Sequence, residues 1–183
     1  MICEKPIVFN TRMVMALLDN KKTQTRIVIK PQPILTPDES FGISWWYWKD
    51  CQWIDGGLGM PETGIEDYAP FRKNDIIWVR ETWNQATDGT YVYKTDDTLQ
   101  EISKLSIHMP HRAARIFLHV IDVRAERLQE ISEKAAVSEG CEPFGDISAK
   151  RVFMIEWNNT HVKRRYGWDT NPWVWVIEFE RIS

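Results

Sequence analysis

Hydrophobic residues are spaced along the chain in two ways, one typical of strands and one typical of helices. Short β-branched and aromatic runs predict strands at 6–9, 27–29, 76–79, 91–93, 114–123 and 173–179. Helical spacing predicts helices that begin at Thr11, which would cap the first of them, at Ser132 and at Ser148. The first should end near residue 20, the second at Gly140 and the third near residue 159. Short strands interrupted by two or three helices predict an α+β fold on a small mixed sheet or barrel.

The stretch from 34 to 70 departs from this pattern, because it is rich in Pro, Gly, Asp and Trp and shows no sustained period. We interpret it as an insertion within one domain that spans 1–183. Four tryptophans fall within the nine residues 45–53 of this insertion: Trp45, Trp46, Trp48 and Trp53. Such a cluster is typical either of a surface that stacks on nucleobases or of a small core under a long loop. We favour the small core, because indole rings bury large apolar areas.

Composition indicates a globular protein, with 43% hydrophobic and 27% charged residues in a chain of 183. No apolar run approaches the roughly 20 residues of a membrane span. Glu4 and Lys5 interrupt any signal-peptide pattern at the N-terminus, so we expect a cytoplasmic protein without a membrane partner. Cys3, Cys51 and Cys141 are far apart and in no paired motif, which predicts reduced thiols.

The formal charge of −3 does not favour broad engagement of a long DNA duplex. Positive charge nevertheless collects locally, which would suit a nucleoside or a short RNA. The basic clusters are Lys21, Lys22, Arg26 and Lys30; His111, Arg112 and Arg115; Lys150 and Arg151; and Lys163, Arg164 and Arg165.

The stretch 21–26, KKTQTR, places amines, hydroxyls and a guanidinium where a helix ends and a strand begins. Lysine and threonine are both useful in acyl transfer. An alternative is that cations simply complement the dipole of the last helical turn and that threonines suit a strand entry.

A second group of candidates follows the strand at 76–79. Arg80 could hold a carbonyl or a phosphate, Glu81 could accept from a hydroxyl or amine, and Trp83 could stack on a base. The alternative for Arg80 and Glu81 is pairing with partners elsewhere in the fold. Tyr93 is also a binding candidate, although tyrosine in an alternating strand is ordinarily a packing residue.

Two histidines, His108 and His111, flank the pair Met109 and Pro110. Since Pro110 breaks any helix that would align the two rings, we expect no metal site there. His108 remains a candidate hydrogen-bond donor in a pocket.

Several of these segments together resemble the ASCH family. The resemblance rests on 22–26 (KTQTR) after a helix, 74–79 (NDIIWV), the helix 131–139 and the closing 176–179 (VIEF). Further segments, 78–83 (WVRETW), 107–110 (IHMP) and 167–169 (GWD), resemble a longer ASCH-type group found in bacteriophages and prophages. The resemblance covers most of the chain and is weakest across 34–70 and 141–165. It implies a fold similar to the PUA RNA-binding domain, a compact β-barrel with flanking helices.

The resemblance also implies a reaction. One bacterial ASCH branch removes the acetyl group from N4-acetylcytidine without a metal or cofactor. Matched to its motif, Thr25 would be the nucleophile, Lys22 its proton acceptor and Glu139 the proton donor. Thr23 and Arg26 of the same motif would contact the substrate. Two alternatives remain: a PUA-like module that binds RNA without turnover, with phosphate on Lys22 and Arg26, and a ribonuclease that uses the same basic cleft.

The amidohydrolase reaction requires its catalytic side chains to lie close together. A threonine hydroxyl is too weak an acid to attack an amide without a neighbouring base, and a lysine can serve as that base. The leaving cytosine amine needs a proton, which a carboxyl can supply. We therefore expect Lys22, Thr25 and Glu139 to converge. The alternative for Glu139 is a solvated helix residue beside the glycine that ends the helix.

Overall fold

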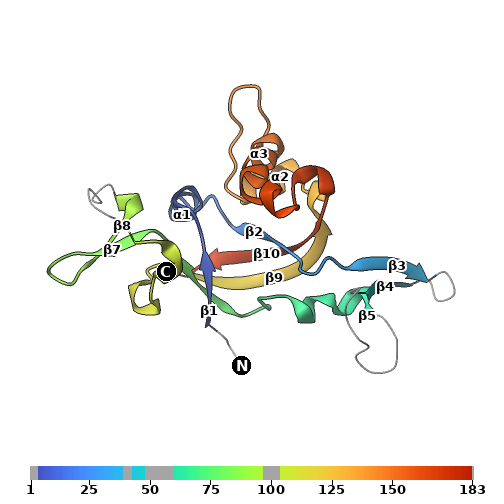
Figure 1. Cartoon of the computed structure of the whole chain (residues 1–183), viewed down its shortest axis with the longest axis horizontal. Coiled ribbons are helices and arrows are strands. Elements are labelled where there is room, and N and C mark those ends of the chain that lie inside the picture. The colour runs from blue at the N-terminus through green and yellow to red at the C-terminus, as the bar shows by residue number, and fades with distance from the viewer. Residues whose placement is uncertain (1–3, 39–42, 48–59, 97–103, 183) are drawn as a thin grey trace.

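A five-stranded mixed sheet forms the centre of the protein (Figure 1). In this computed structural model, residues 4–38, 43–47, 60–96 and 104–182 are described. The strand order is β1-β6-β9-β10-β2, formed by β1 (Glu4–Val8), β6 (Ile76–Arg80), β9 (Phe117–Arg127), β10 (Trp173–Arg181) and β2 (Gln24–Val28). β1 runs parallel to β6, and the other neighbours are antiparallel. The α+β class and the mixed sheet with flanking helices are therefore confirmed.

Each face of the sheet carries its own hydrophobic cluster, because residues alternate between the faces along β10. Trp173, Trp175, Ile177 and Phe179 join a cluster with α1 (Thr11–Leu18). Val174 and Val176 join a second cluster with α2 (Glu133–Ser138) and α3 (Ala149–His161). The aromatic and β-branched run at the C-terminus thus packs against α1 through one set of side chains and against α2 and α3 through the other.

Two smaller sheets lie at opposite ends of the central one (Figure 1). β3 (Ile34–Asp38), β4 (Ile43–Tyr47) and β5 (Met60–Pro61) form one, within the predicted insertion. β7 (Trp83–Gln85) and β8 (Tyr91–Tyr93) form the other. The predicted small core of tryptophans concerns side chains outside the described part of the chain, so it stays a prediction, as does the assignment of 34–70 as an insertion.

Short 3-10 turns connect these elements. They are η1 (Glu62–Tyr68), η2 (Lys94–Asp96), η3 (Ser106–His108), η4 (His111–Ala113), η5 (Leu128–Glu130), η6 (Val162–Arg164) and η7 (Trp168–Thr170). Within the described ranges, no helix has the length and apolar character needed to cross a bilayer.

The predicted strands and helices are all present, with shifted ends. The cap of α1 is Asn10, whose side chain accepts from the Met13 amide, so the prediction of Thr11 was wrong by one residue. β2 begins at Gln24 because its register with β10 extends to Glu178. Ser132 and Ser148 cap α2 and α3 as predicted.

Candidate functional site

The loop between α1 and β2 is fixed by backbone hydrogen bonds. The amides of Lys21 and Lys22 both donate to the Ala16 carbonyl, at 2.8 and 3.0 Å. Thr23 donates to the Ser138 carbonyl at 2.8 Å, which ties the loop to the end of α2. Because α1 ends at Leu18, neither lysine lies in its last turn, and the dipole explanation of the two cations is wrong.

Lys22 is buried and forms an ion pair with Glu139, a residue 117 positions away in the chain. The ammonium Nζ donates to Glu139 Oε2 at 2.7 Å, to the Glu139 carbonyl at 3.0 Å and to the Gln24 carbonyl at 2.7 Å. All three ammonium protons therefore have an acceptor. The Lys22 side chain is 0% exposed and that of Glu139 is 4% exposed, so the interpretation of Glu139 as a solvated helix residue is wrong.

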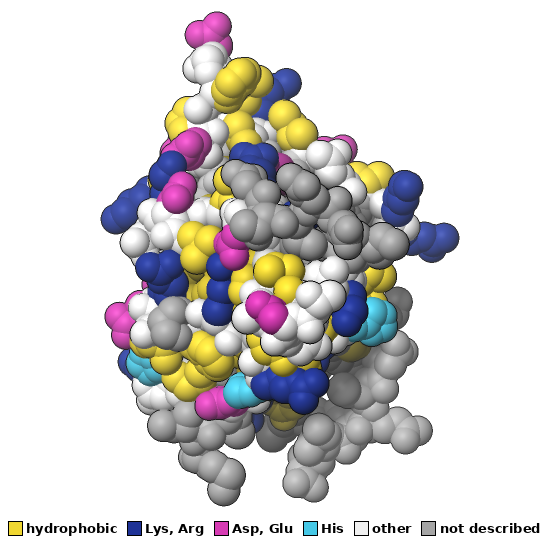
Figure 2. All heavy atoms as spheres, turned by 90° about the vertical axis from the view of Figure 1, so that its left-hand side faces the viewer, with side chains coloured by type: hydrophobic (Ala, Val, Ile, Leu, Met, Phe, Trp, Pro, Cys, Tyr) yellow, Lys and Arg dark blue, Asp and Glu magenta, His cyan; other side chains and the backbone are white. Residues whose placement is uncertain are grey.

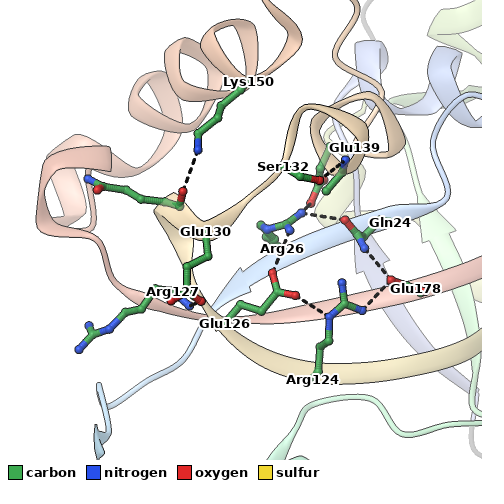
Figure 3. Close-up of polar contacts among 12 residues, drawn as sticks. Gln24, Arg26, Arg124, Glu126, Arg127, Glu130, Ser132, Glu139, Lys150 and Glu178 are labelled. Atoms are coloured by element: carbon green, nitrogen blue, oxygen red, sulfur yellow. Dashed lines mark hydrogen bonds and ion pairs between the residues drawn. The ribbon is translucent and has the colours of Figure 1, made fainter.

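Arg26 holds the second oxygen of the same carboxylate (Figure 3). Its Nη1 donates to Glu139 Oε1 at 3.0 Å and to Gln24 Oε1 at 2.9 Å, while Nη2 donates to Glu126 Oε2 at 3.1 Å. With one oxygen of Glu139 on Arg26 and the other on Lys22, the orientation of the carboxyl is fixed.

The polar network continues from Arg26 toward the surface (Figure 3). Arg124 Nε donates to Glu126 Oε1 at 2.5 Å, and Arg124 Nη1 donates to Glu178 Oε1 at 2.6 Å. Gln24 Nε2 donates to the same Glu178 oxygen at 2.8 Å. Burial decreases along this path, from the covered Glu139 to the partly exposed Arg124 and Glu178.

The Thr25 side chain lies on the face of β2 opposite to those of Gln24 and Arg26, because side chains alternate between the two faces of a strand. Thr25 is the register partner of Ile177, so the two side chains share one face of the sheet. Ile177 belongs to the same cluster as Phe9, and the Lys22 ammonium lies 5.4 Å from the centre of the Phe9 ring. The Lys22 ammonium thus contacts Glu139 and also lies near a ring of the cluster that Ile177 joins.

Gly140 sets the approach of α2 to this loop. Its φ of +89° is left-handed, which ends the helix directly after Glu139, and only glycine adopts it without strain. A Cβ at this position would meet the Ala16 Cβ at 2.8 Å and the Lys22 Cβ at 3.5 Å. The glycine predicted from the sequence to end the helix therefore also allows Glu139 to reach Lys22.

Cys141 borders the same site. It is buried and its pKa is raised from 9.0 to about 11, first because burial disfavours the thiolate and then because of the Glu139 charge. Cys141 is thus a protonated thiol at neutral pH.

Glu81, which is buried and directly follows β6, belongs to a second cluster of ion pairs. Arg115 donates to both of its oxygens, at 2.9 and 3.0 Å, and also to Asp96 at 2.8 Å. The Arg115 guanidinium lies 3.8 Å from the centre of the Tyr93 ring. Glu81 therefore has a partner within the fold, which is the alternative that the sequence left open.

Trp83 and Tyr93 pack in a small core beside this cluster. Trp83 is 6% exposed and Tyr93 8%, and they share the core with Met109 and Ala113. The Tyr93 hydroxyl donates to the Ala113 carbonyl at 2.8 Å, and burial raises its pKa. Both rings are buried, which is typical of residues that pack in a core.

Arg80 and His108 lie at the edge of this region. The Arg80 guanidinium lies 4.6 Å from the centre of the Trp78 ring and donates to the Ile107 carbonyl at 3.3 Å. His108 is exposed in η3. Figure 2 shows the side of the molecule that faces left in Figure 1, where Lys and Arg side chains are interspersed with acidic and hydrophobic ones. No three His, Cys, Asp or Glu side chains gather for a metal ion among the residues that the structure describes.

The structure therefore brings Lys22, Arg26 and Glu139 together, while the Thr25 side chain lies on the opposite face of β2 from Arg26. It places Glu81, Trp83 and Tyr93 in a separate cluster. The sequence interpretation missed the outer network of Gln24, Glu126, Arg124 and Glu178. A signal was present, because Gln24 and Arg26, like Arg124 and Glu126, are spaced by two and so share a face of their strand.

Comparison with known proteins gives one structural similarity. No family model matches this chain, and no curated protein does. Among solved structures, the chain is similar to an ASCH domain from Lactobacillus crispatus JV V101, with a TM-score of 0.44 and 11% sequence identity. The match covers 98% of this chain and 79% of that one.

Proposed function

We propose that the protein is a metal-independent amidohydrolase that removes the acyl group from an acylated cytosine nucleoside such as N4-acetylcytidine. The observation that carries the proposal is the buried contact of 2.7 Å between Lys22 Nζ and Glu139 Oε2. The motif 22–26 and its resemblance to the amidohydrolase branch of the ASCH family suggest the substrate.

The Lys22–Glu139 pair supplies both an acid and a base. If the shared proton moves from Nζ to Oε2, the pair becomes a neutral amine beside a carboxylic acid. The amine is then the base that Thr25 needs, and the acid is the donor that the leaving amine needs. Arg26 holds Oε1, so Oε2 is the oxygen that carries the proton.

The reaction then proceeds in two steps. The Thr25 oxygen attacks the acetyl carbonyl carbon and gives its proton to Lys22, and the bond from that carbon to N4 breaks as Glu139 protonates N4. Cytidine leaves, and the acetyl group stays on Thr25 as an ester. Lys22 returns its proton to Glu139 across their contact, and the neutral amine then takes a proton from the water that attacks the ester carbon. Lys22 gives this proton to the Thr25 oxygen as the bond from that oxygen to the acetyl carbon breaks, and acetic acid leaves.

Access to the site requires an opening step. Lys22, Thr25 and Glu139 are 2%, 4% and 7% exposed, so a nucleoside reaches them only when the covering segments move apart. The loop 19–23 joins α1 to β2 and contacts the end of α2, which makes it the segment that would have to move.

The test is hydrolysis of N4-acetylcytidine by the purified protein, followed as cytidine and acetate released in equal amounts. Lys22→Met, Thr25→Val and Glu139→Gln should each lower kcat at least a hundredfold, about the range for a lost acid, base or nucleophile. Thr25→Ser keeps the hydroxyl and should retain part of the activity.

Neighbouring residues offer matched controls. Lys21 pairs with Glu142 at 2.7 Å on the surface, the same length as the buried contact, so Lys21→Met and Glu142→Gln should keep wild-type rates. Turnover that survives in Thr25→Val would exclude the mechanism. Cleavage of RNA with no release of acetate would favour the ribonuclease alternative.

A further inference from the structure

A basic surface lies around η6, far along the chain from the Lys22 motif. It consists of Lys30, His161, Lys163, Arg164, Arg165 and Tyr166, and we call it the η6 surface. The three consecutive cations and Lys30 are exposed, and the Lys30 ammonium lies 5.1 Å from the centre of the Tyr166 ring. His161 stacks on Trp157, with ring centres 3.9 Å apart and planes 14° apart.

Some cations of the protein pair with carboxylates, whereas the cations of this surface have no such partner among the described residues. Lys5, Arg12, Lys21, Arg115 and Arg124 each pair with a carboxylate. Over the described ranges, the side chains of Lys30, Lys163, Arg164 and Arg165 form no ion pair with a carboxylate. Four unpaired cations gathered on a chain of net charge −3 repel one another unless an anion joins them.

The pKa of His161 responds to these positive charges. This pKa is lowered, first by burial and then by the charges of Arg164 and Lys30, while a hydrogen bond to the Trp157 carbonyl acts in the opposite sense. Because Lys30 and Arg164 both act on this imidazole, a cation that follows β2 and a cation of η6 lie near the same ring. A bound anion would offset these positive charges and would therefore raise the pKa of the His161 ring.

The combination of spaced cations with aromatic rings fits one class of partner. A polymer of phosphates matches several cations in a row, and rings beside a basic track are the common means of holding bases of a single strand. Four cations are too few for a long duplex at physiological salt. We propose that the η6 surface binds the phosphate backbone of a single-stranded nucleic acid.

This site is independent of the proposed reaction. The sequence-based alternative placed phosphate on Lys22 and Arg26, whose side chains are 0% and 1% exposed and already paired. The η6 surface provides unpaired cations at the surface instead. Its test uses binding alone, so a failure of hydrolysis and a failure of this proposal are separate results.

The experiment measures fluorescence anisotropy of labelled 12-nucleotide single-stranded RNA and DNA, with inorganic phosphate as competitor, over a series of salt concentrations. The test variant is Lys163→Gln, Arg164→Gln and Arg165→Gln combined. The control combines Lys73→Gln, Arg112→Gln and Lys134→Gln, three exposed cations on other elements. Both variants remove three positive charges, so a difference in binding between them reports the position of the charges and not the net charge of the protein.

We expect the test variant to bind at least about tenfold more weakly than the control, with the slope of log K against log salt smaller by about 2. Nuclear magnetic resonance should show the His161 pKa rising when the strand binds. Binding of RNA and DNA alike would support recognition of the phosphates, and a preference for RNA would add contacts to the 2′-hydroxyl. Equal weakening in both variants, or no binding at low salt, would overturn the proposal.

Discussion

The two neighbouring lysines, Lys21 and Lys22, form ion pairs of the same length in opposite environments. Lys21 Nζ lies 2.7 Å from Glu142 on the surface, and Lys22 Nζ lies 2.7 Å from Glu139 in the interior. Removing the carboxylate charge from each pair is therefore a controlled test of burial. Glu139→Gln keeps the shape of the side chain, and Glu142→Gln is its matched control.

The expected magnitudes differ sharply. Glu139→Gln leaves Lys22 without a counter-charge and takes one of two carboxylates from Arg26. Breaking a buried pair in this way costs about 3–5 kcal/mol. For a chain of this size, this loss lowers Tm by about 6–20 °C. Glu142→Gln should leave the unfolding curve unchanged, because exposed pairs are screened by solvent.

The assay is urea unfolding followed by circular dichroism at pH 7, with a double-mutant cycle that adds Lys22→Met. The methionine removes the orphaned ammonium, so Lys22→Met with Glu139→Gln should be more stable than Glu139→Gln alone. A loss below about 1 kcal/mol in Glu139→Gln would refute the reasoning, since it would mean that the Lys22 ammonium reaches water.

Three further predictions concern the surroundings of the site. Gly140→Ala should destabilise the fold by about 2 kcal/mol, because it strains a left-handed residue and crowds Ala16, and Ala16→Gly should recover part of the loss in the same urea assay. Arg115→Met should cost about 3 kcal/mol by leaving Glu81 buried and unpaired, and adding Glu81→Gln should restore stability; a loss in the single variant that the second change does not relieve would contradict this account. Cys141 should react with iodoacetamide at pH 8 only after unfolding, as seen by peptide mass spectrometry. Because its pKa is raised on folding, the stability that the protonated thiol contributes is complete below pH 9.0 and is lost as pH rises to about 11, which pH-dependent urea midpoints would show.

Local sequence patterns were sufficient to predict the three α-helices described and the five strands of the central sheet. The run 173–179 alternates, so it predicted a strand, and the capping serines at 132 and 148 predicted where two helices begin. The stretch 34–70 lacks a sustained period, and its three strands were not predicted, because Pro and Gly interrupt the alternation there.

Long-range pairing limited the prediction of the site. The motif and the helix-ending glycine pointed to Lys22 and Glu139, but their burial depends on a contact across 117 residues, which no local pattern contains. The same limit explains Glu81, whose partner Arg115 is 34 residues away. Strand ends expose side chains in general, yet Glu81, directly after β6, is paired with Arg115 from the segment between η4 and β9.

The most direct test of the proposed mechanism is to look for the covalent intermediate on Thr25. The protein is mixed with N4-acetylcytidine, quenched in acid within seconds, digested and analysed by mass spectrometry. We predict one acetyl group on the peptide that contains Thr25, lost with time in the wild type and never formed in Thr25→Val or Lys22→Met. Hydrolysis of the substrate without an acetylated Thr25 peptide at any time, or with the acetyl group on another residue, would contradict the account.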